Sequence, residues 1–157
     1  MKKYVLLLSL IIIGFSACKK DKDNFDATAQ AAKDEADIQA YLKANPSITA
    51  TKDASGVYYQ ILTAGTGANP KATSTVSVNY VGKLLNGGTQ FDAGNGFSAN
   101  LDGGVIKGWT YGIPLGKVGG RILLIIPSAL AYGNTSPGAA IPKNSVLVFT
   151  IDILGFS

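Results

Sequence analysis

The chain has 157 residues, of which 46% are hydrophobic and 19 are glycine, enough for one compact, turn-rich domain with additional segments. It contains no histidine and a single cysteine, Cys18. Histidine-based catalytic triads, histidine metal sites, intrachain disulfides and thiolate metal centres are therefore excluded. The formal net charge is +4, and it falls to about +2 if Lys2 and Lys3 leave with a cleaved N-terminal segment. Such a small net positive charge does not favour a nucleic-acid partner.

The N-terminus has the pattern of an export signal. Two lysines precede an apolar run from Tyr4 to Phe15, which is short for a membrane span. The run ends in Phe15-Ser16-Ala17-Cys18, which resembles a bacterial lipobox. We therefore expect residues 1–17 to be a lipoprotein signal peptide, and Cys18 to carry diacylglycerol and further acyl chains such as palmitate. Each buried methylene adds about 0.8 kcal/mol of membrane affinity. The protein would then be a lipoprotein of the cell envelope, most simply in the outer membrane; an ordinary secretory signal with an incidental thiol is the alternative.

Residues 18–48 are predicted to form the lipid-anchored tether and a short helix. A charged run follows Cys18, and Asp26 or Thr28 is placed to cap a helix that reaches about Ala44, before Asn45-Pro46 ends it. Its largest apolar residues share one face: Ile38, Tyr41 and Leu42. With so few large apolar residues, we favour a spacer helix that packs on the domain over an arm for dimerisation or client binding.

From Thr49 onward the pattern becomes that of short strands joined by turns. Strands are predicted over residues 57–62, 76–81, 121–126 and 146–156, with another beginning at Gln90. Asn86-Gly87-Gly88 is a strong hairpin signal, and the short connections favour antiparallel pairing. Residues 105–115 fit a short helix, although two glycines and a proline weaken that pattern. The expected class is α+β.

Four ordered segments carry a family resemblance: VNYVGKLLNGGTQFD, FSANLDGGVIKGWTYGIPLGKVGGR, IIPSALAYG and PGAAIPKNSVLVFTIDIL. Together they resemble the FKBP-type peptidyl-prolyl cis-trans isomerases, over about Lys52 to Ser157. The resemblance implies a curved antiparallel sheet, a half-barrel, wrapped around a short α-helix, with the active cleft between them. We place this domain at residues 49–157.

The resemblance also implies the site residues. Trp109 matches the floor of the cleft, and Asp92 matches a carboxylate beside Tyr80. The positions that match catalytic residues are Phe91, Asp92, Trp109 and Tyr132. The positions that match the substrate-binding walls are Tyr80, Phe97, Val105, Ile106, Ile141 and Phe149. In the family, the backbone N–H at the Ile106 position and the hydroxyl at the Tyr132 position hold carbonyl oxygens of the ligand.

Rotation about an X-Pro bond needs no nucleophile, metal or cofactor. Amide resonance sets a barrier of about 18–20 kcal/mol, and spontaneous exchange takes tens to hundreds of seconds. The twisted amide is less polar than the planar one, so an apolar cleft binds the transition state better than the ground state. The resemblance therefore implies an isomerase that acts on proline-containing segments of exported proteins, with macrolides as possible ligands.

Two departures from the family pattern support an alternative function. No arginine follows the Phe91-Asp92 pair, so Asp92 must rely on Tyr80, backbone donors or water. Ala99 stands where an aromatic residue is common, which predicts a cleft that is wider on one side. The alternative is a weakly catalytic, membrane-anchored chaperone or adaptor that binds clients in the same cleft.

The aromatic residues also have an alternative role, since most buried aromatic residues of a β-rich domain only pack the core.

Overall fold

The computed structural model describes residues 25–157, so the predicted signal peptide and Cys18 lie outside the described part. In chain order the elements are α1 (Ala27–Ala44), β1 (Thr51–Lys52), β2 (Tyr58–Thr63), β3 (Thr75–Leu84), β4 (Gln90–Asn100), α2 (Lys107–Gly112), the 3₁₀ helix η1 (Ile113–Leu115), β5 (Arg121–Ile126), the 3₁₀ helix η2 (Ser128–Leu130) and β6 (Leu147–Phe156). The predicted strands and helices are confirmed within a few residues at their ends, and β1 is an addition. No helix within residues 25–157 is long and apolar enough to cross a membrane.

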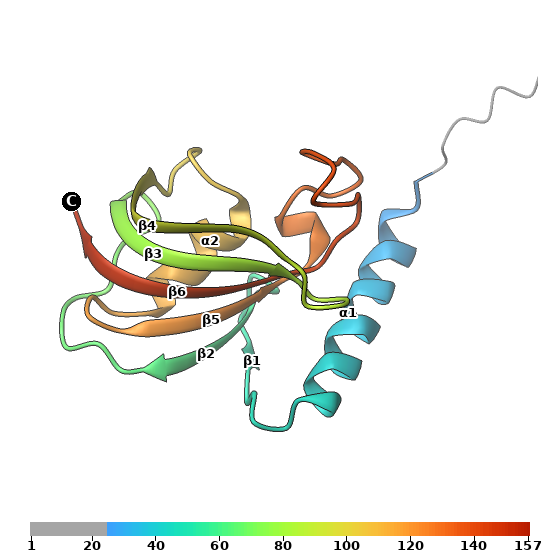
Figure 1. Cartoon of the computed structure of the whole chain (residues 1–157), viewed down its shortest axis with the longest axis horizontal. Coiled ribbons are helices and arrows are strands. Elements are labelled where there is room, and N and C mark those ends of the chain that lie inside the picture. Colours follow the sequence, from blue (N-terminus) through green and yellow to red (C-terminus); the bar gives the residue numbers. More distant parts are fainter. Residues whose placement is uncertain (1–24) are drawn as a thin grey trace, which may run out of the picture.

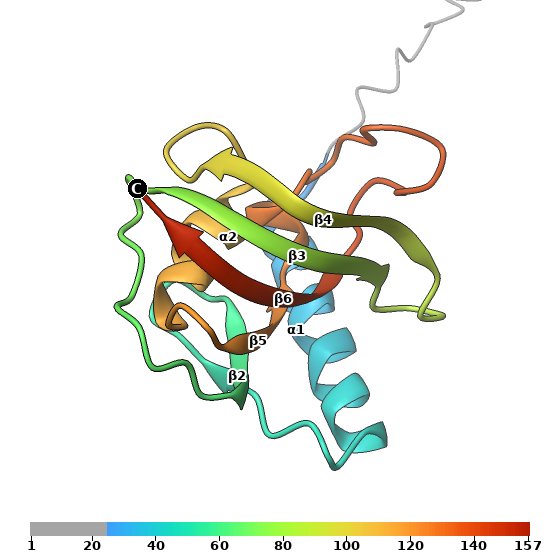
Figure 2. The same ribbon diagram turned by 60° about the vertical axis from the view of Figure 1, so that its left-hand side comes forward.

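The strands form one sheet of 6 strands in the order β1-β2-β5-β6-β3-β4. Every pair of neighbours is antiparallel, as the short connections predicted. The sheet curves around α2, and α1 lies at its other side (Figures 1 and 2). This is the half-barrel wrapped around a short helix that the family resemblance implied.

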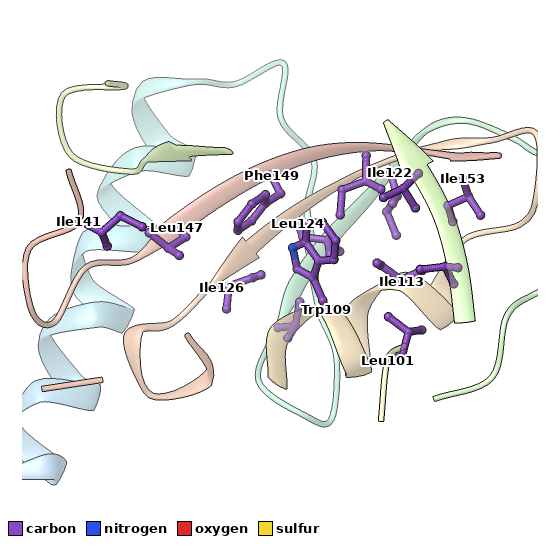
Figure 3. Packing of buried hydrophobic residues seen from close by; sticks show 14 residues of the cluster. Leu101, Trp109, Ile113, Ile122, Leu124, Ile126, Ile141, Leu147, Phe149 and Ile153 are labelled. Carbon is purple, nitrogen blue, oxygen red and sulfur yellow. The ribbon is translucent and has the colours of Figure 1, made fainter. Parts of the chain in front are cut away.

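Strand β5 separates two clusters of buried residues, because successive side chains of a strand point to opposite faces. Ile122, Leu124 and Ile126 face α2 and contribute to the main core with Trp109 and Phe149 (Figure 3). Leu123 and Ile125 face the other way and pack with Ile38 of α1. A strand that is buried on both faces has a continuous run of apolar residues, which is the pattern of residues 122–126.

Helix α1 begins and ends where the sequence predicted. The Asp26 carboxylate accepts hydrogen bonds from the backbone N–H groups of Thr28 (2.9 Å) and Ala29 (3.0 Å), and Asn45 caps the other end. Ile38 is fully buried against the sheet. The helix is therefore docked on the domain, as expected of the spacer helix.

The structure supplies the end of β4, which the sequence analysis left open. The strand begins at Gln90 as predicted and continues to Asn100. Its pairing with β3 shifts register between Phe97 and Gly94, so one strand carries extra residues there. The Asn79 side chain accepts the N–H of Gly96, which has a φ of 62°, at 2.8 Å and holds this bulge.

Candidate active site

A cavity of about 160 Å³ opens on the concave side of the sheet, beside α2. The residues that line it are Tyr80, Phe91, Asp92, Phe97, Gly104, Val105, Ile106, Trp109, Tyr132 and Phe149. They come from β3, β4, β6, α2 and the segments before α2 and after β5. The fold therefore gathers in one place side chains that are far apart in the sequence.

Trp109 of α2 forms the floor of the cavity. It is 4% exposed, and Figure 3 shows its ring directed from α2 toward the strands. Its ring meets those of Tyr80 at 5.1 Å and Phe149 at 5.3 Å, both edge to face. Aromatic rings prefer this arrangement. The Trp109 Nε1–H has no hydrogen-bond partner within the described residues, so the floor carries one buried donor.

The wall opposite α2 depends on two strand positions without a side chain. A Cβ atom at Gly82 would lie 2.7 Å from ring atoms of both Phe149 and Phe91. A Cβ atom at Gly94 would lie 2.6 Å from the ring of Tyr80. The aromatic rings therefore lie directly over the backbone of β3 and β4, and only glycine leaves room for them.

The polar edge of the cavity is the pair Tyr80 and Asp92. The Tyr80 hydroxyl donates to Oδ2 of Asp92 at 2.7 Å, and the N–H of Ala93 donates to Oδ1 at 2.9 Å. Burial, and then the bond to Asp92, raise the pKa of Tyr80 to about 12, so its hydroxyl stays protonated near neutral pH. The expectation that Asp92 relies on Tyr80 and the backbone in place of an arginine is confirmed.

Two of the residues that line the cavity, Tyr132 and Ile106, carry a hydrogen-bond donor without an acceptor among the described residues. Tyr132 is 39% exposed, and its side chain lines the cavity. Ile106 immediately precedes α2, and its N–H has no acceptor within residues 25–157. Two unpaired donors among the aromatic residues of one cavity can bind a ligand with two carbonyl groups.

The structure separates one predicted residue from the others. Ile141 does not line the main cavity but a neighbouring one of about 220 Å³, which shares Phe91, Asp92 and Tyr132 with it. The Ser136 hydroxyl, 2.7 Å from the carbonyl oxygens of both Gly138 and Ile141, donates a hydrogen bond in this loop. All other predicted site residues of the domain line the main cavity.

The structure places Ala99 outside the residues that line the cavity: it pairs with Val76 and is buried. Gly104 lines the cavity but was not predicted. Its position directly before Val105 and Ile106 was the available signal.

This combination defines a class of protein: α+β domains in which a curved antiparallel sheet encloses a short helix, with an aromatic cleft between them. The family model described as FKBP-type peptidyl-prolyl cis-trans isomerase matches residues 67–154. The chain belongs to this family.

Relatives of the chain carry the same family name. It is 39% identical over 137 residues to a probable FKBP-type peptidyl-prolyl cis-trans isomerase of Haemophilus influenzae, covering 85% of the chain and 56% of the relative. It is 44% identical over 138 residues to the FKBP-type isomerase FkpA of Escherichia coli K12, covering 82% of the chain and 50% of the relative. The chain thus spans about half the length of these curated relatives.

Solved structures agree with the fold. A peptidyl-prolyl cis-trans isomerase from Pseudomonas syringae pv. tomato superposes with a TM-score of 0.70 at 30% identity, covering 85% of this chain and 98% of that one. Escherichia coli FkpA superposes with a TM-score of 0.68 at 39% identity, covering 83% and 62%. The expected fold class is therefore confirmed.

Proposed function

We propose that the protein is a peptidyl-prolyl cis-trans isomerase that turns X-Pro bonds in the cavity above Trp109. The observation that carries the proposal is the cavity itself, with an aromatic floor and walls, the Tyr80–Asp92 pair at one edge and unpaired donors of Tyr132 and Ile106 among its lining residues. Family membership supports the same activity.

Each group of cavity residues has its own role in such a reaction. The rings of Trp109, Phe91 and Phe149 enclose the proline ring and exclude water. Because the twisted amide has lost resonance and polarity, this apolar surface stabilises it more than the planar amide. The Tyr132 hydroxyl and the Ile106 N–H hold the flanking carbonyl groups, and the Tyr80–Asp92 pair fixes one wall. No proton transfer or covalent step is required.

A protease-coupled assay on a proline peptide tests the proposal. Tyr132→Phe removes one hydrogen bond, worth about 1 kcal/mol, and should lower kcat/KM roughly fivefold. Trp109→Leu removes the aromatic floor of the cavity and should lower kcat/KM further. Tyr111→Phe is the matched control, since Tyr111 is 42% exposed and lies on the helix of Trp109 but not in the cavity. Wild-type activity in the double variant Trp109→Leu, Tyr132→Phe would refute the proposal.

We also propose that macrolides of the kind that FKBP proteins bind occupy this cavity, since its apolar floor and open donors suit a cyclic ligand with carbonyl groups. Such a ligand should inhibit turnover competitively, and Trp109→Leu should weaken the inhibition. Inhibition that is unchanged in Trp109→Leu would contradict this placement.

We further propose that the protein acts outside the cytoplasm on exported proteins, anchored through lipid on Cys18 in the cell envelope, with the outer membrane the favoured site. The support is the N-terminal pattern of two lysines, an apolar run and the lipobox-like residues before Cys18. Metabolic labelling with a palmitate analogue should mark the wild type, and Cys18→Ser should lose both the label and detergent partitioning. An unlabelled, soluble wild type would refute the anchor.

A further inference from the structure

A buried carboxylate joins α1 to the domain. Asp34 is 2% exposed, and its Oδ2 accepts two hydrogen bonds from Ser128, one from the backbone N–H (2.8 Å) and one from the hydroxyl (2.7 Å). Gln30 donates to the other oxygen at 2.7 Å. Ser128 is itself 1% exposed. Every polar atom of this contact is thus paired, as a buried carboxylate requires.

Ser128 organises the segment that carries Tyr132. It is the first residue of η2, which Pro127 separates from the end of β5. Its carbonyl oxygen accepts hydrogen bonds from the N–H groups of Ala131 (3.0 Å) and Gly133 (2.8 Å), the two residues that flank Tyr132. Figure 1 shows this orange segment beside the N-terminal half of α1. Ser128 is therefore held in place by Asp34 of α1, and its carbonyl oxygen in turn holds the backbone on both sides of Tyr132.

We propose that Asp34 is a positioning residue for the active site, acting through Ser128 on Tyr132. The inference rests on the proposed function, since it assigns a role in turnover to a helix that lies outside the matched family segment at residues 67–154. The helix is more than a spacer: its buried carboxylate sets the place of a hydroxyl at the mouth of the cavity. An active site depends on such placement, because misplacing a group by about 1 Å costs as much as about 100-fold in rate.

The next residue of the same helix supplies a matched control. Glu35 also joins α1 to the domain, accepting bonds from the Tyr58 hydroxyl (2.5 Å) and the Lys52 ammonium (2.8 Å). These partners lie on β2 and β1, and neither lines the cavity. Loss of Glu35 loosens the same helix without touching the Tyr132 segment.

Isomerase kinetics on the full chain separate the two roles. Asp34→Ala should lower kcat/KM about tenfold, and Glu35→Ala less than about twofold, a difference that loss of helix docking alone does not produce. Asp34→Asn retains an acceptor oxygen for Ser128 and should restore activity to within about twofold of wild type. In the Asp34→Ala background, Tyr132→Phe should lose most of its roughly fivefold effect, because the hydroxyl is already misplaced.

Equal losses in Asp34→Ala and Glu35→Ala, or a full Tyr132→Phe effect in the Asp34→Ala background, would overturn the inference. If circular dichroism shows Asp34→Ala to be unfolded, Ser128→Ala replaces it in the same comparison with Glu35→Ala. That variant removes only the hydroxyl donor and should lower kcat/KM about threefold.

Amide hydrogen exchange distinguishes this inference from the proposed function. Exchange at Ala131 and Gly133 should be faster in Asp34→Ala than in wild type and unchanged in Glu35→Ala. Unchanged exchange in Asp34→Ala would refute the positioning role whether or not the protein is active. An inactive wild type with this exchange pattern would refute only the proposed function.

Discussion

Gly82 offers a precise test of the cavity wall. In Gly82→Ala the new Cβ would lie 2.7 Å from Phe149 and Phe91, about 0.7 Å inside the ordinary contact distance of about 3.4 Å. The rings of Phe91 and Phe149 both meet the new Cβ, and they already pack edge to face against each other, with their centroids 5.6 Å apart. At least one ring must therefore move by several tenths of an ångström toward the cavity.

This displacement should appear in both stability and turnover. Inserting a methyl group into a packed core costs about 1–3 kcal/mol. A comparable shift of a substrate-contacting wall should lower kcat/KM about tenfold or more. Urea unfolding measures the loss of stability. Protease-coupled isomerase kinetics, without denaturant and at a temperature where the variant is folded, measure the loss of turnover.

Gly155→Ala is the control for these measurements. Gly155 lies on β6, next to β3 in the same sheet, and a Cβ there would meet nothing within 4 Å. It should leave turnover near the wild-type value. If folded Gly82→Ala turns over as fast as Gly155→Ala, the rings above Gly82 do not form a wall that substrate contacts, and the assignment of Phe91 and Phe149 is refuted.

Three further predictions concern titration and capping. Burial, and then the bond to Asp92, raise the pKa of Tyr80 from 10.0 to about 12, so its stabilising contribution is full below pH ~10 and is lost as pH rises through ~12. Burial and Glu35 also raise the pKa of Tyr58. Ultraviolet titration should therefore show late tyrosines, of which one moves earlier in Asp92→Asn, and a titration that Asp92→Asn leaves unchanged would contradict the Tyr80–Asp92 pair. The pKa of Glu35 is lowered from 4.5 to about 2 by hydrogen bonds from Lys52 and then Tyr58. The stability difference between wild type and Glu35→Gln should therefore be full above pH ~4.5 and disappear as pH falls through ~2, and a pH-independent difference would argue against the contact. Asp26→Ala removes the N-cap of α1 and should cost about 1 kcal/mol in urea unfolding, with no loss if the cap is unformed in solution.

Local sequence patterns predicted most of the fold. Asp26 and Asn45-Pro46 set the ends of α1, because capping and helix termination depend only on near neighbours. The apolar run of β5 and the hairpin signal at Asn86-Gly87-Gly88 likewise act within a few residues. The family resemblance of the ordered motifs then predicted the floor and most of the wall residues, which the structure gathers in one cavity.

Long-range geometry accounts for what was missed. The bulge at Gly96 depends on the Asn79 side chain of the neighbouring strand, so the length of β4 and the place of Ala99 did not follow from alternation alone. The contact of Asp34 with Ser128 joins residues 94 positions apart. The sequence analysis assigned no role to Asp34, since no local signal marks a carboxylate whose partner lies so far along the chain.

The most direct test of the account is cis–trans exchange of an X-Pro peptide followed by NMR exchange spectroscopy, which needs no coupling protease. Spontaneous exchange takes tens to hundreds of seconds. The account predicts that micromolar folded protein brings exchange into the range of seconds or faster, and that Trp109→Leu with Tyr132→Phe returns it toward the spontaneous rate. Exchange that stays at the spontaneous rate with folded wild-type protein would contradict the claim that this cavity isomerises proline peptides.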